Sequence, residues 1–430
     1  MCGQSEWLSG EWKRAMTDFL TLDDLDFKNK TVLLRVDINV PVDKYTKRIS
    51  ESKRIDESTI TIRELASKGA KVVVTAHQGR AGDYDFLPLD QHAEVLKALL
   101  GERFEFEYVD DTIGIAARDR IESLQSGEIL LLQNIRFLAE ETLELGPEEH
   151  ANGILVSRLS ALADLFVNDA FPSAHRSHAS IVGLTAKLPS AAGRIMEQEL
   201  RYDRQAVITP RHPVVYVLGG GKPDDNIEVL QHGFQEGIID KVLSSGVLGL
   251  LFLVAREYNL GEETVNFLRN KGHFERLQEV RDLLVKYGQH IDVPVDVAFS
   301  SNGKRVEVPV KELPARGVIK DIGEGTIQIF KAVIKDAKTM VVKGPPGVYE
   351  DSGFEVGTKE ILEAITQSNG FSLVGGGHTL SAIQRLNINE KGFSYISLGG
   401  GALINYLSGR SLPALEALRQ AAARYKAGVV

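Results

Sequence analysis

The segment VVYVLGGGK, Val214 to Lys222, runs an apolar strand directly into three glycines, and the pattern returns as FSLVGGGHT (Phe371 to Thr379) and YISLGGGAL (Tyr395 to Leu403). Glycine has no Cβ, so the backbone can approach an anion closely. The free N–H groups that begin a following helix would face that anion, and the helix dipole adds positive potential. One such run could be only a tight turn, but three in one half of the chain predict a polyphosphate site.

The spacing of these glycines excludes two familiar nucleotide sites. The dinucleotide fingerprint G-x-G-x-x-G requires a glycine where the three runs carry Asp224, Leu380 and Ile404. The P-loop, G-x-x-x-x-G-K-[ST], fails at both ends of the first run, because Tyr216 occupies the first glycine position and Pro223 follows the lysine. The predicted site is therefore neither a standard NAD site nor a Walker site.

Composition indicates an ordinary globular protein. The chain has 430 residues, enough for two domains, with 43% hydrophobic and 25% charged residues. Cys2 is the only cysteine, which fits a reducing compartment. The polar N-terminus, MCGQSEWLSGEWKRAM, lacks the apolar core of a signal peptide, and no apolar run reaches the ~18 residues of a membrane span. We therefore expect a cytoplasmic protein that is not bound to a membrane.

The formal net charge of −9 argues against general nucleic-acid binding. An anionic substrate must therefore be held by local positive charge. Small molecules are the expected partners, and the protein could be a monomer or a homodimer.

Short apolar runs alternate with longer amphipathic segments throughout the chain. The predicted strands are 32–36, 72–76, 129–132 and 165–167 in the first half, and 214–218, 339–342, 371–374 and 395–398 in the second; 57–68 and 91–100 are typical of the intervening helices. This alternation predicts α/β structure with parallel sheets. The charged segment 193–205 (GRIMEQELRYDRQ) is expected to be a helix between two domains.

Polar residues follow each predicted strand of the first half. They are Asp37 and Asn39 in RVDINVP, His77 and Arg80 in TAHQGR, Asn134 and Arg136 in QNIRF, and Asp169, His175 and Arg176 in VNDAFPSAHRSHAS. Any one of them could be a surface arginine, a turn-forming aspartate or a loop histidine. Ligands of open parallel sheets bind at the carboxyl ends of the strands, so four successive clusters predict one basic pocket there.

These segments, in this order, resemble phosphoglycerate kinase. The resemblance rests on RVDINVP, HQGR, NIRF and DAF…AHRSHAS in the first half and on LGGGK, GPPGVYE, GGGHT and SLGGGALINYLSGRSLPALEAL in the second, and it runs from about Phe19 to about Leu418. It implies two doubly wound, Rossmann-like domains joined by a helix and hinge. The implied boundaries are 17–192 for the N-terminal domain, 193–205 for the helix, 206–406 for the C-terminal domain and 407–430 for a segment that returns to the N-terminal domain.

The resemblance also implies site residues. The N-terminal domain would bind 3-phosphoglycerate through Asp37, Asn39, Arg54, His77, Arg80, Arg136 and Arg176. The C-terminal domain would bind ATP or ADP through Gly219, Gly220, Lys222, Gly246, Lys343, Pro345, Val348, Glu350, Gly375, Gly376, Gly377, His378 and Thr379, with Gly399, Gly400 and Gly401 facing the transferring phosphate. Arg54 and Lys222 are the expected catalytic cations.

Three positions depart from the usual pattern of that family. Asn226 stands where most members carry a second lysine, His378 where they carry an aspartate that serves the metal, and Lys343 where they carry an asparagine. The first two departures are similar to the archaeal branch. They leave the protein ligand of the metal open, so Mg²⁺ is expected to bind mainly through the nucleotide phosphates. Lys343 could replace the lost cation, or it could be an exposed lysine at a strand end.

The implied reaction needs no general base, because the acceptor carboxylate is already ionised at pH 7. Alignment and charge neutralisation would supply the catalysis, and domain closure would bring the substrates together. A non-catalytic, nucleotide-dependent binding protein is the alternative. A dehydrogenase is disfavoured by the failed fingerprint. Residues 1–14 precede the resemblance, Met16 could be the natural start, and this stretch is expected to add nothing to catalysis.

Overall fold

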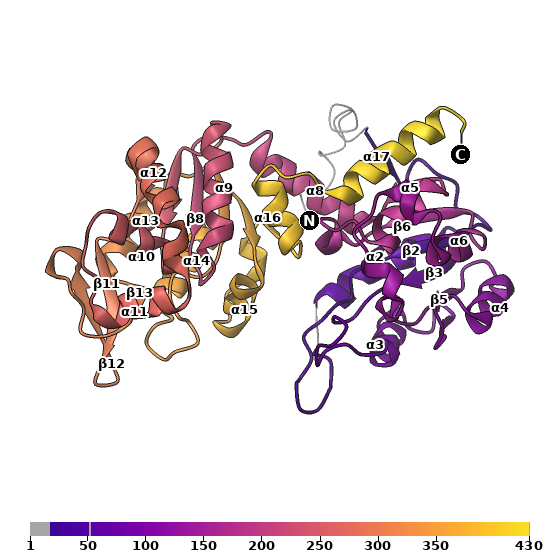
Figure 1. Cartoon of the computed structure of the whole chain (residues 1–430), viewed down its shortest axis with the longest axis horizontal. Coiled ribbons are helices and arrows are strands. Elements are labelled where there is room, and N and C mark those ends of the chain that lie inside the picture. The colour runs from indigo at the N-terminus through magenta and orange to yellow at the C-terminus, as the bar shows by residue number, and fades with distance from the viewer. Residues whose placement is uncertain (1–17, 51–52, 430) are drawn as a thin grey trace. The chain divides into compact units, whose positions relative to one another are not determined.

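The computed structural model describes residues 18–50 and 53–429, which form two compact units (Figure 1). The first unit comprises the chain up to Leu200 together with the segment from Ser411 onward, and the second unit comprises Arg201–Arg410. The expectation for residues 1–14 falls outside the described residues.

The first unit is built on a parallel sheet of seven described strands in the order β1-β7-β6-β2-β3-β5-β4. They are β1 (Leu20–Thr21), β2 (Thr31–Arg35), β3 (Lys71–Thr75), β4 (Phe106–Tyr108), β5 (Ile129–Leu131), β6 (Leu165–Asn168) and β7 (Ser190–Ala192). The chain runs from β2 to β3 in one direction and later returns to the other side of β2 as β6. The carboxyl ends of β2 and β6 therefore flank the point where the winding reverses, which is where open α/β sheets bind ligands.

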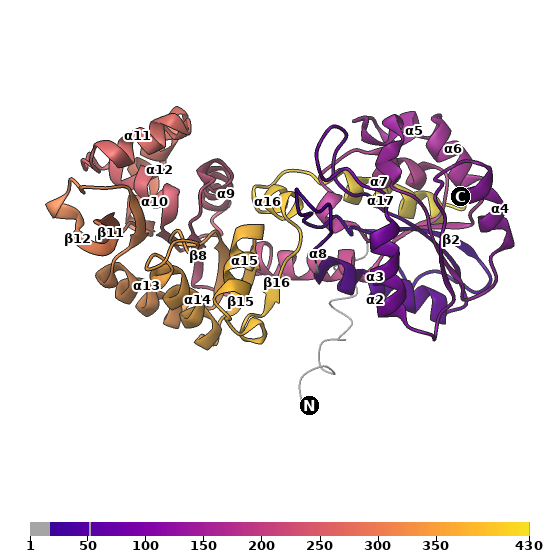
Figure 2. The same cartoon turned by 90° about the horizontal axis from the view of Figure 1, so that it is seen from below.

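Helices cover both faces of this sheet, because successive residues of its strands point to opposite sides. Leu34 and Val74 pack with α2 (Lys53–Ser67) and α3 (Asp90–Leu100). Leu33 and Val73 pack with α4 (Ile115–Ser123) and α6 (Ile154–Ser160), and the short helices α5 (Pro147–His150) and α7 (Ala179–Val182) lie beside α6 (Figure 2). The strands are buried on both faces, which explains their continuous apolar sequences.

The second unit repeats this design with a parallel sheet of six described strands in the order β10-β9-β8-β14-β15-β16. They are β8 (Val214–Leu218), β9 (Lys241–Ser244), β10 (Ile291–Asp292), β14 (Thr339–Lys343), β15 (Phe371–Gly375) and β16 (Tyr395–Ile396). The winding reverses between β8 and β14, so the glycine run after β8 lies at the switch point. The predicted pair of doubly wound parallel sheets is confirmed.

Helices again sandwich the sheet of the second unit. On one side lie α9 (Pro223–Gln235), α10 (Gly246–Ala255), α11 (Glu262–Asn270), α12 (Leu277–Tyr287) and α16 (Gly401–Leu407). On the other side lie α13 (Glu324–Asp336), α14 (Val356–Gln367) and α15 (Gly377–Arg385), as Figure 2 shows. The helices α9, α10, α15 and α16 each begin within a few residues of the end of a strand, so their N-termini lie at its carboxyl edge.

A small antiparallel sheet in the second unit departs from the expectation of parallel sheets alone. It has the order β12-β11-β13, with β11 (Asp296–Ser301), β12 (Lys304–Pro309) and β13 (Ile319–Ile322). Asn302 and Gly303 join β11 to β12, and both have positive φ, 52° and 74°. An Asn-Gly pair between two strands is the usual signal of a two-residue hairpin. The pair is visible in the sequence, although the alternation of strands and helices around it predicted parallel sheets only.

Two helices lie at the limits of the units. The helix α8 (Arg194–Val207) crosses the boundary at Leu200, where the sequence predicts a helix over 193–205. The helix α17 (Pro413–Lys426) packs on β7 and α7 of the first unit, and Figure 2 shows α17 beside α7. None of the described helices is long and apolar enough to cross a membrane.

Candidate functional site

A basic cluster lies at the carboxyl edge of the first sheet. Its members follow β2, β3, β5 and β6 or begin α2, and they are Asp37, Asn39, Arg54, His77, Arg80, Arg136 and Arg176. The parallel strands end at one edge, so residues that are far apart in sequence meet there. Hydrogen bonds and charge interactions join several of these side chains.

Asp37 organises the cluster through one buried carboxylate. Its Oδ1 accepts a hydrogen bond from Arg54 Nη1 at 3.0 Å, and its Oδ2 accepts one from Ser173 Oγ at 3.0 Å. Burial alone would raise the pKa of Asp37, but Arg54 and Arg35, with the hydrogen bond from Ser173, hold it below its ordinary value. The carboxylate therefore stays ionised and aligns Arg54.

Hydrogen bonds also fix the imidazole of His77 and the guanidinium of Arg136. Arg35, the last residue of β2, donates from Nη2 to His77 Nδ1 at 2.8 Å. Arg136 donates from Nη1 to the carbonyl of Gly79 at 2.6 Å, and its buried Nε has no hydrogen-bond partner. Burial and then the charge of Arg176 lower the pKa of Arg136 to about 10, so it is still a cation at neutral pH. The orphaned Nε leaves one donor of a buried cation unsatisfied.

Arg176 and Arg80 form the outer part of the cluster. Arg176 is half-buried and Arg80 is exposed. Burial lowers the pKa of Arg176, and the nearby charge of Arg80 lowers it further. Two guanidiniums so close repel each other, and an anion between them would relieve that repulsion.

Two of the polar residues that follow the strands have structural roles. Asn134 donates from Nδ2 to the carbonyls of Gln78 and Leu87, both at 2.8 Å. Asp169 accepts hydrogen bonds from the amides of Ile195 and Met196 at 2.8 and 3.0 Å, and so caps the N-terminus of α8. Their positions after strands are the same as those of the basic residues, so position alone does not separate the two roles.

The glycine runs of the second unit meet at the carboxyl edge of its sheet. The amide of Gly219 donates to the carbonyl of Lys343 at 2.9 Å, and the amide of Gly220 donates to that of Pro345 at 2.8 Å. Gly344 has φ +82°, and a Cβ there would lie 2.3 Å from the carbonyl oxygen of Gly219. A Cβ on Gly219 would likewise lie 2.6 Å from the carbonyl oxygen of Pro345, so the close packing of the loops after β8 and β14 requires glycine at both positions.

A side chain links the second glycine run, Gly375–Gly377, to the loop after β14. Thr379, in the first turn of α15, accepts a hydrogen bond from the amide of Gly344 at 2.9 Å. Gly377 and His378 are exposed at the start of the same helix. Gly400, with φ +53°, similarly precedes α16. The three glycine runs therefore present helix N-termini at one edge of the sheet, an arrangement suited to phosphates.

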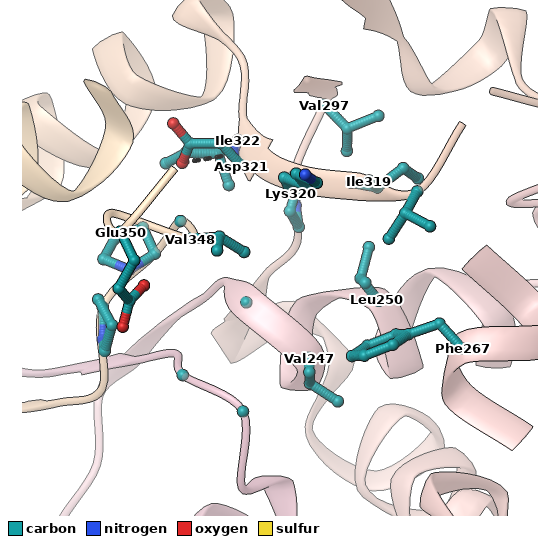
Figure 3. Close-up of a pocket in the computed structure, with 18 of the residues that line it drawn as sticks. Val247, Leu250, Phe267, Val297, Ile319, Lys320, Asp321, Ile322, Val348 and Glu350 are labelled. Atoms are coloured by element: carbon teal, nitrogen blue, oxygen red, sulfur yellow. Dashed lines mark hydrogen bonds between the residues drawn. The ribbon is translucent and has the colours of Figure 1, made fainter. Parts of the chain in front are cut away.

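A cavity of about 390 Å³ opens beside these loops (Figure 3). Val247, Leu250 and Phe267 form one apolar wall, and Val297, Ile319 and Val348 complete it. Glu350 supplies a carboxylate at the other side (Figure 3), whereas the buried carboxylate of Asp321 is paired with Arg305 Nη1 at 2.8 Å. A flat apolar slot bordered by a few polar groups fits an aromatic base and a sugar.

The predicted nucleotide residues divide between the cavity and the loops next to it. Those that line the cavity are Gly220, Gly246, Pro345, Val348, Glu350 and His378. Those outside its lining are Gly219, Lys222, Lys343, Gly375, Gly376, Gly377, Thr379, Gly399, Gly400 and Gly401. The second group belongs to or borders the glycine loops, where phosphates rather than the base would lie.

Two lysines border the glycine loops. Lys222 is exposed at the N-terminus of α9, and Lys343 is buried, with 8% of its surface exposed. Burial lowers the pKa of Lys343, Asp225 opposes that shift, and the charge of Lys222 adds to it. Both lysines therefore contribute positive charge beside the glycine loops.

The donor set fits a metal that is held chiefly by phosphate and water. Within residues 18–50 and 53–429, no three His, Cys, Asp or Glu side chains gather in a way that could hold a metal ion. Mg²⁺ commonly keeps several waters and binds through one or two carboxylates plus substrate phosphates. His378 occupies the start of α15, and an imidazole is not a ligand that Mg²⁺ prefers.

Two features of the sites escaped the sequence prediction. Arg35 lies inside RVDINVP, within the predicted strand 32–36, and a position within a strand gives no sign of a role at the site. Two residues of the cavity's apolar wall, Val247 and Leu250, come from α10, whose sequence GVLGLLFLVA is typical of a buried core helix. No periodicity distinguishes an apolar helix that borders a cavity from one that lies wholly in the core.

Known proteins resemble this chain along nearly its whole length. A family model described as phosphoglycerate kinase matches residues 22–410. The phosphoglycerate kinase of Methanothermobacter thermautotrophicus is 44% identical over 402 residues, which cover 94% of this chain and 97% of that protein. That of Saccharolobus solfataricus is 43% identical over 398 residues, or 93% and 96% of the two chains.

Solved structures agree with the sequence relatives. The crystal structure of phosphoglycerate kinase from Pyrococcus horikoshii OT3 matches with a TM-score of 0.87 and 37% identity, covering 94% of this chain and 99% of that one. The structure of phosphoglycerate kinase from Coxiella burnetii matches with a TM-score of 0.77 and 28% identity, at the same coverage.

Proposed function

Because the chain belongs to the phosphoglycerate kinase family, with relatives in archaea, we propose roles for its individual residues in that family's reaction. The function is reversible phosphoryl transfer, in which 1,3-bisphosphoglycerate and ADP give 3-phosphoglycerate and ATP, a step of glycolysis and gluconeogenesis. No comparison favours the alternative of a non-catalytic binding protein.

We assign the acceptor to the basic cluster of the first unit. The observation that carries this assignment is the bond between Arg54 and the buried, ionised Asp37, which fixes a guanidinium at the edge of the sheet. Arg136, Arg176 and Arg80 surround it with positive charge on a protein of net charge −9. Guanidinium forks bind phosphate and carboxylate oxygens in pairs, so this set suits 3-phosphoglycerate, which carries both groups.

We assign the nucleotide to the second unit. The apolar wall formed by Val247, Leu250 and Phe267 would take the base, and Glu350 would take hydroxyl groups of the ribose. The phosphates would extend over Gly219–Gly221 toward the N-termini of α9 and α15. Lys222 and Lys343 would neutralise their negative charge.

The chemistry needs little beyond alignment and charge. The acceptor carboxylate attacks the terminal phosphorus of ATP while the bond from that phosphorus to the bridging oxygen breaks, and no proton has to move. Arg54 and Lys222 would stabilise the transferring group as catalytic residues. Mg²⁺, held mainly by the nucleotide phosphates, would supply further charge neutralisation. Closure of the two domains stays a prediction.

Two further expectations accompany this assignment. We propose that the protein acts in the cytoplasm, on the grounds that it has a single cysteine and takes part in glycolysis. We also propose small molecules as its only substrates, with no nucleic acid, and either a monomer or a homodimer as its form in solution.

Hydrogen exchange tests where each substrate binds. Addition of 3-phosphoglycerate to the full chain should protect amides around residues 37–39 and 77–80, and addition of ADP with Mg²⁺ should protect those around 219–222 and 344–348. Protection of the glycine loops by 3-phosphoglycerate alone would reverse the assignment of the two units.

A further inference from the structure

Arg35 is a buried cation whose donors are all directed to specific partners. None of its surface is exposed, and it lies at the end of β2 directly beneath the basic cluster. Nε donates to Ser180 Oγ at 2.8 Å, Nη1 donates to the carbonyl of Val36, and Nη2 contacts His77 Nδ1 at 2.8 Å. A buried charge held by this many directed bonds has a fixed orientation.

Glu141 supplies the negative charge nearest to the guanidinium of Arg35 in this buried network. Its carboxylate is fully buried, accepts hydrogen bonds from the hydroxyl and amide of Ser180 at 2.7 and 2.8 Å, and lies 4.0 Å from Arg35 Nη2. The hydroxyl of Ser180 therefore accepts from Arg35 and donates to Glu141. A continuous chain of bonds runs from Glu141 through Ser180 and Arg35 to His77.

The direction of the last bond follows from the chemistry of arginine. A guanidinium has donors and no acceptor, so the atom that it contacts in His77 must accept. Nδ1 of His77 therefore carries no proton, and in a neutral imidazole the proton is on Nε2. Among the described residues, Nε2 of His77 has no hydrogen-bond partner. It is also absent from the buried atoms that lack a partner, so Nε2 reaches the surface.

Charges around His77 oppose its protonation. Burial lowers its pKa well below the ordinary value, and Arg35 lowers it further. Arg136 and Arg176, from the segments after β5 and β6, act in the same direction, whereas Asp37 opposes them. Three cations and one carboxylate thus face a ring that is 3% exposed, and the neutral form is favoured.

We infer that Arg35 is a positioning residue that holds His77 as a neutral imidazole with its proton on Nε2, so that His77 offers this N–H to an oxygen of the acidic substrate. The inference deepens the proposed function and depends on the acceptor lying at the basic cluster. It assigns His77 the part of a directed neutral donor among the arginines. His77 then stays neutral across neutral pH, so the hydrogen bond from its Nε2–H to the substrate does not change with pH in that range.

Nitrogen NMR of the uniformly labelled full chain measures this tautomer directly. Long-range couplings between ring protons and ring nitrogens distinguish a protonated Nε2 from a protonated Nδ1, and loss of one signal set in His77→Gln assigns the residue. His290 provides an internal control, because its Nδ1 lies 2.9 Å from the carbonyl of Asp240 and must donate to it. We expect Nε2–H for His77 and Nδ1–H for neutral His290 in the same spectrum.

Three substitutions extend the test to Arg35 and to the substrate. Arg35→Lys retains the charge that balances Glu141 but has no second nitrogen to reach His77, and it should mix the two tautomers and raise the pKa of His77. His77→Gln places an amide N–H near the position of Nε2, whereas His77→Asn places it near Nδ1. We expect His77→Asn to weaken 3-phosphoglycerate binding roughly tenfold more than His77→Gln does.

The outcomes separate the inference from the function on which it depends. An imidazolium form of His77 in the wild-type protein at pH 6 to 8, or a proton on Nδ1, overturns the inference even if 3-phosphoglycerate shifts its signals. An Nε2–H tautomer that 3-phosphoglycerate leaves unshifted supports the role of Arg35 but overturns the donor role of His77. Hydrogen exchange around residues 37–39 and 77–80 decides separately whether 3-phosphoglycerate still binds at the basic cluster.

Discussion

The ammonium of Lys343 lies 2.8 Å from Oδ1 of Asn226, at the switch point of the second sheet. These are two of the three positions at which the chain departs from the pattern that the family resemblance implies. Asn226 stands where a lysine is usual and Lys343 where an asparagine is usual, and the two side chains touch. The departures thus form one reciprocal exchange that retains a lysine–asparagine pair between α9 and β14.

The exchange predicts that Lys343 performs the work of the missing lysine. Lys343→Asn should lower kcat by roughly 10²-fold, the scale of losing one preorganised charge, and should raise the KM for ATP less. The double variant Asn226→Lys/Lys343→Asn should recover most of kcat, because the cation returns from the facing position. Steady-state kinetics of the single and double variants measure both effects.

Lys338 provides the matched control for that experiment, since it is an exposed lysine before the first residue of the same strand. Lys338→Asn should have wild-type kinetics. A Lys343→Asn variant with wild-type kinetics, or a double variant no better than Lys343→Asn alone, would remove the exchange from the account and leave Lys222 and Arg54 as the proposed cations.

Arg54 and Arg136 should differ in what they support. Arg54→Ala should reduce kcat by roughly 10²-fold with little change in ADP affinity, because Arg54 belongs to the first unit. Arg136→Ala should instead weaken the binding of 3-phosphoglycerate. Calorimetric titration with each ligand beside steady-state kinetics separates the two effects, and a loss of ADP affinity in Arg54→Ala with kcat intact would refute the assignment.

Gly246 should be indispensable for the nucleotide loop. Its φ is +52°, and an added Cβ would lie 2.6 Å from the amide nitrogen of Gly220. Gly246→Ala must displace the loop after β8, so ADP affinity should fall by at least tenfold. Gly237→Ala is the control: its φ is +66° with open space around the Cβ, so it should cost only the ~1–2 kcal/mol of left-handed strain. Equal ADP affinity in the two variants would contradict this prediction.

Asp169 should make stability depend on pH. Burial raises its pKa to about 7, against hydrogen bonds from Thr61, Met196 and Ile195. The protonated carboxyl of Asp169 therefore contributes fully to the stability of the fold below about pH 4. This contribution, up to about 4 kcal/mol, is lost as pH rises through about 7. Asp169→Asn cannot ionise, so its melting temperature should increase relative to that of the wild type as pH rises from 5 to 8. A constant difference across that range would rule out a titrating Asp169.

The framework of both units could be predicted from the sequence because buried parallel strands have continuous apolar runs. Val214–Leu218 and Phe371–Gly375 are examples, and their ends differ from the prediction by at most one residue. Glycine was informative near these strand ends because a Cβ on Gly344 would collide with the backbone of Gly219.

Side-chain partners across the sheet could not be predicted. Arg35 and Glu141 are 106 positions apart, and their pairing depends on which strands are neighbours. The contact between Lys343 and Asn226 likewise depends on the pairing of β8 with β14. Asp169 shows the converse, because its position after a strand indicated a ligand-binding role although it caps a helix.

A coupled assay of the full chain with ATP, Mg²⁺ and 3-phosphoglycerate tests the central claim most directly. ADP should form only when 3-phosphoglycerate is present, and ATP should form from ADP when 1,3-bisphosphoglycerate is supplied. Arg54→Ala should lower both rates in parallel, because both directions pass through the same transition state. Folded protein that releases ADP equally with and without 3-phosphoglycerate, or that transfers no phosphoryl group in either direction, would contradict the account.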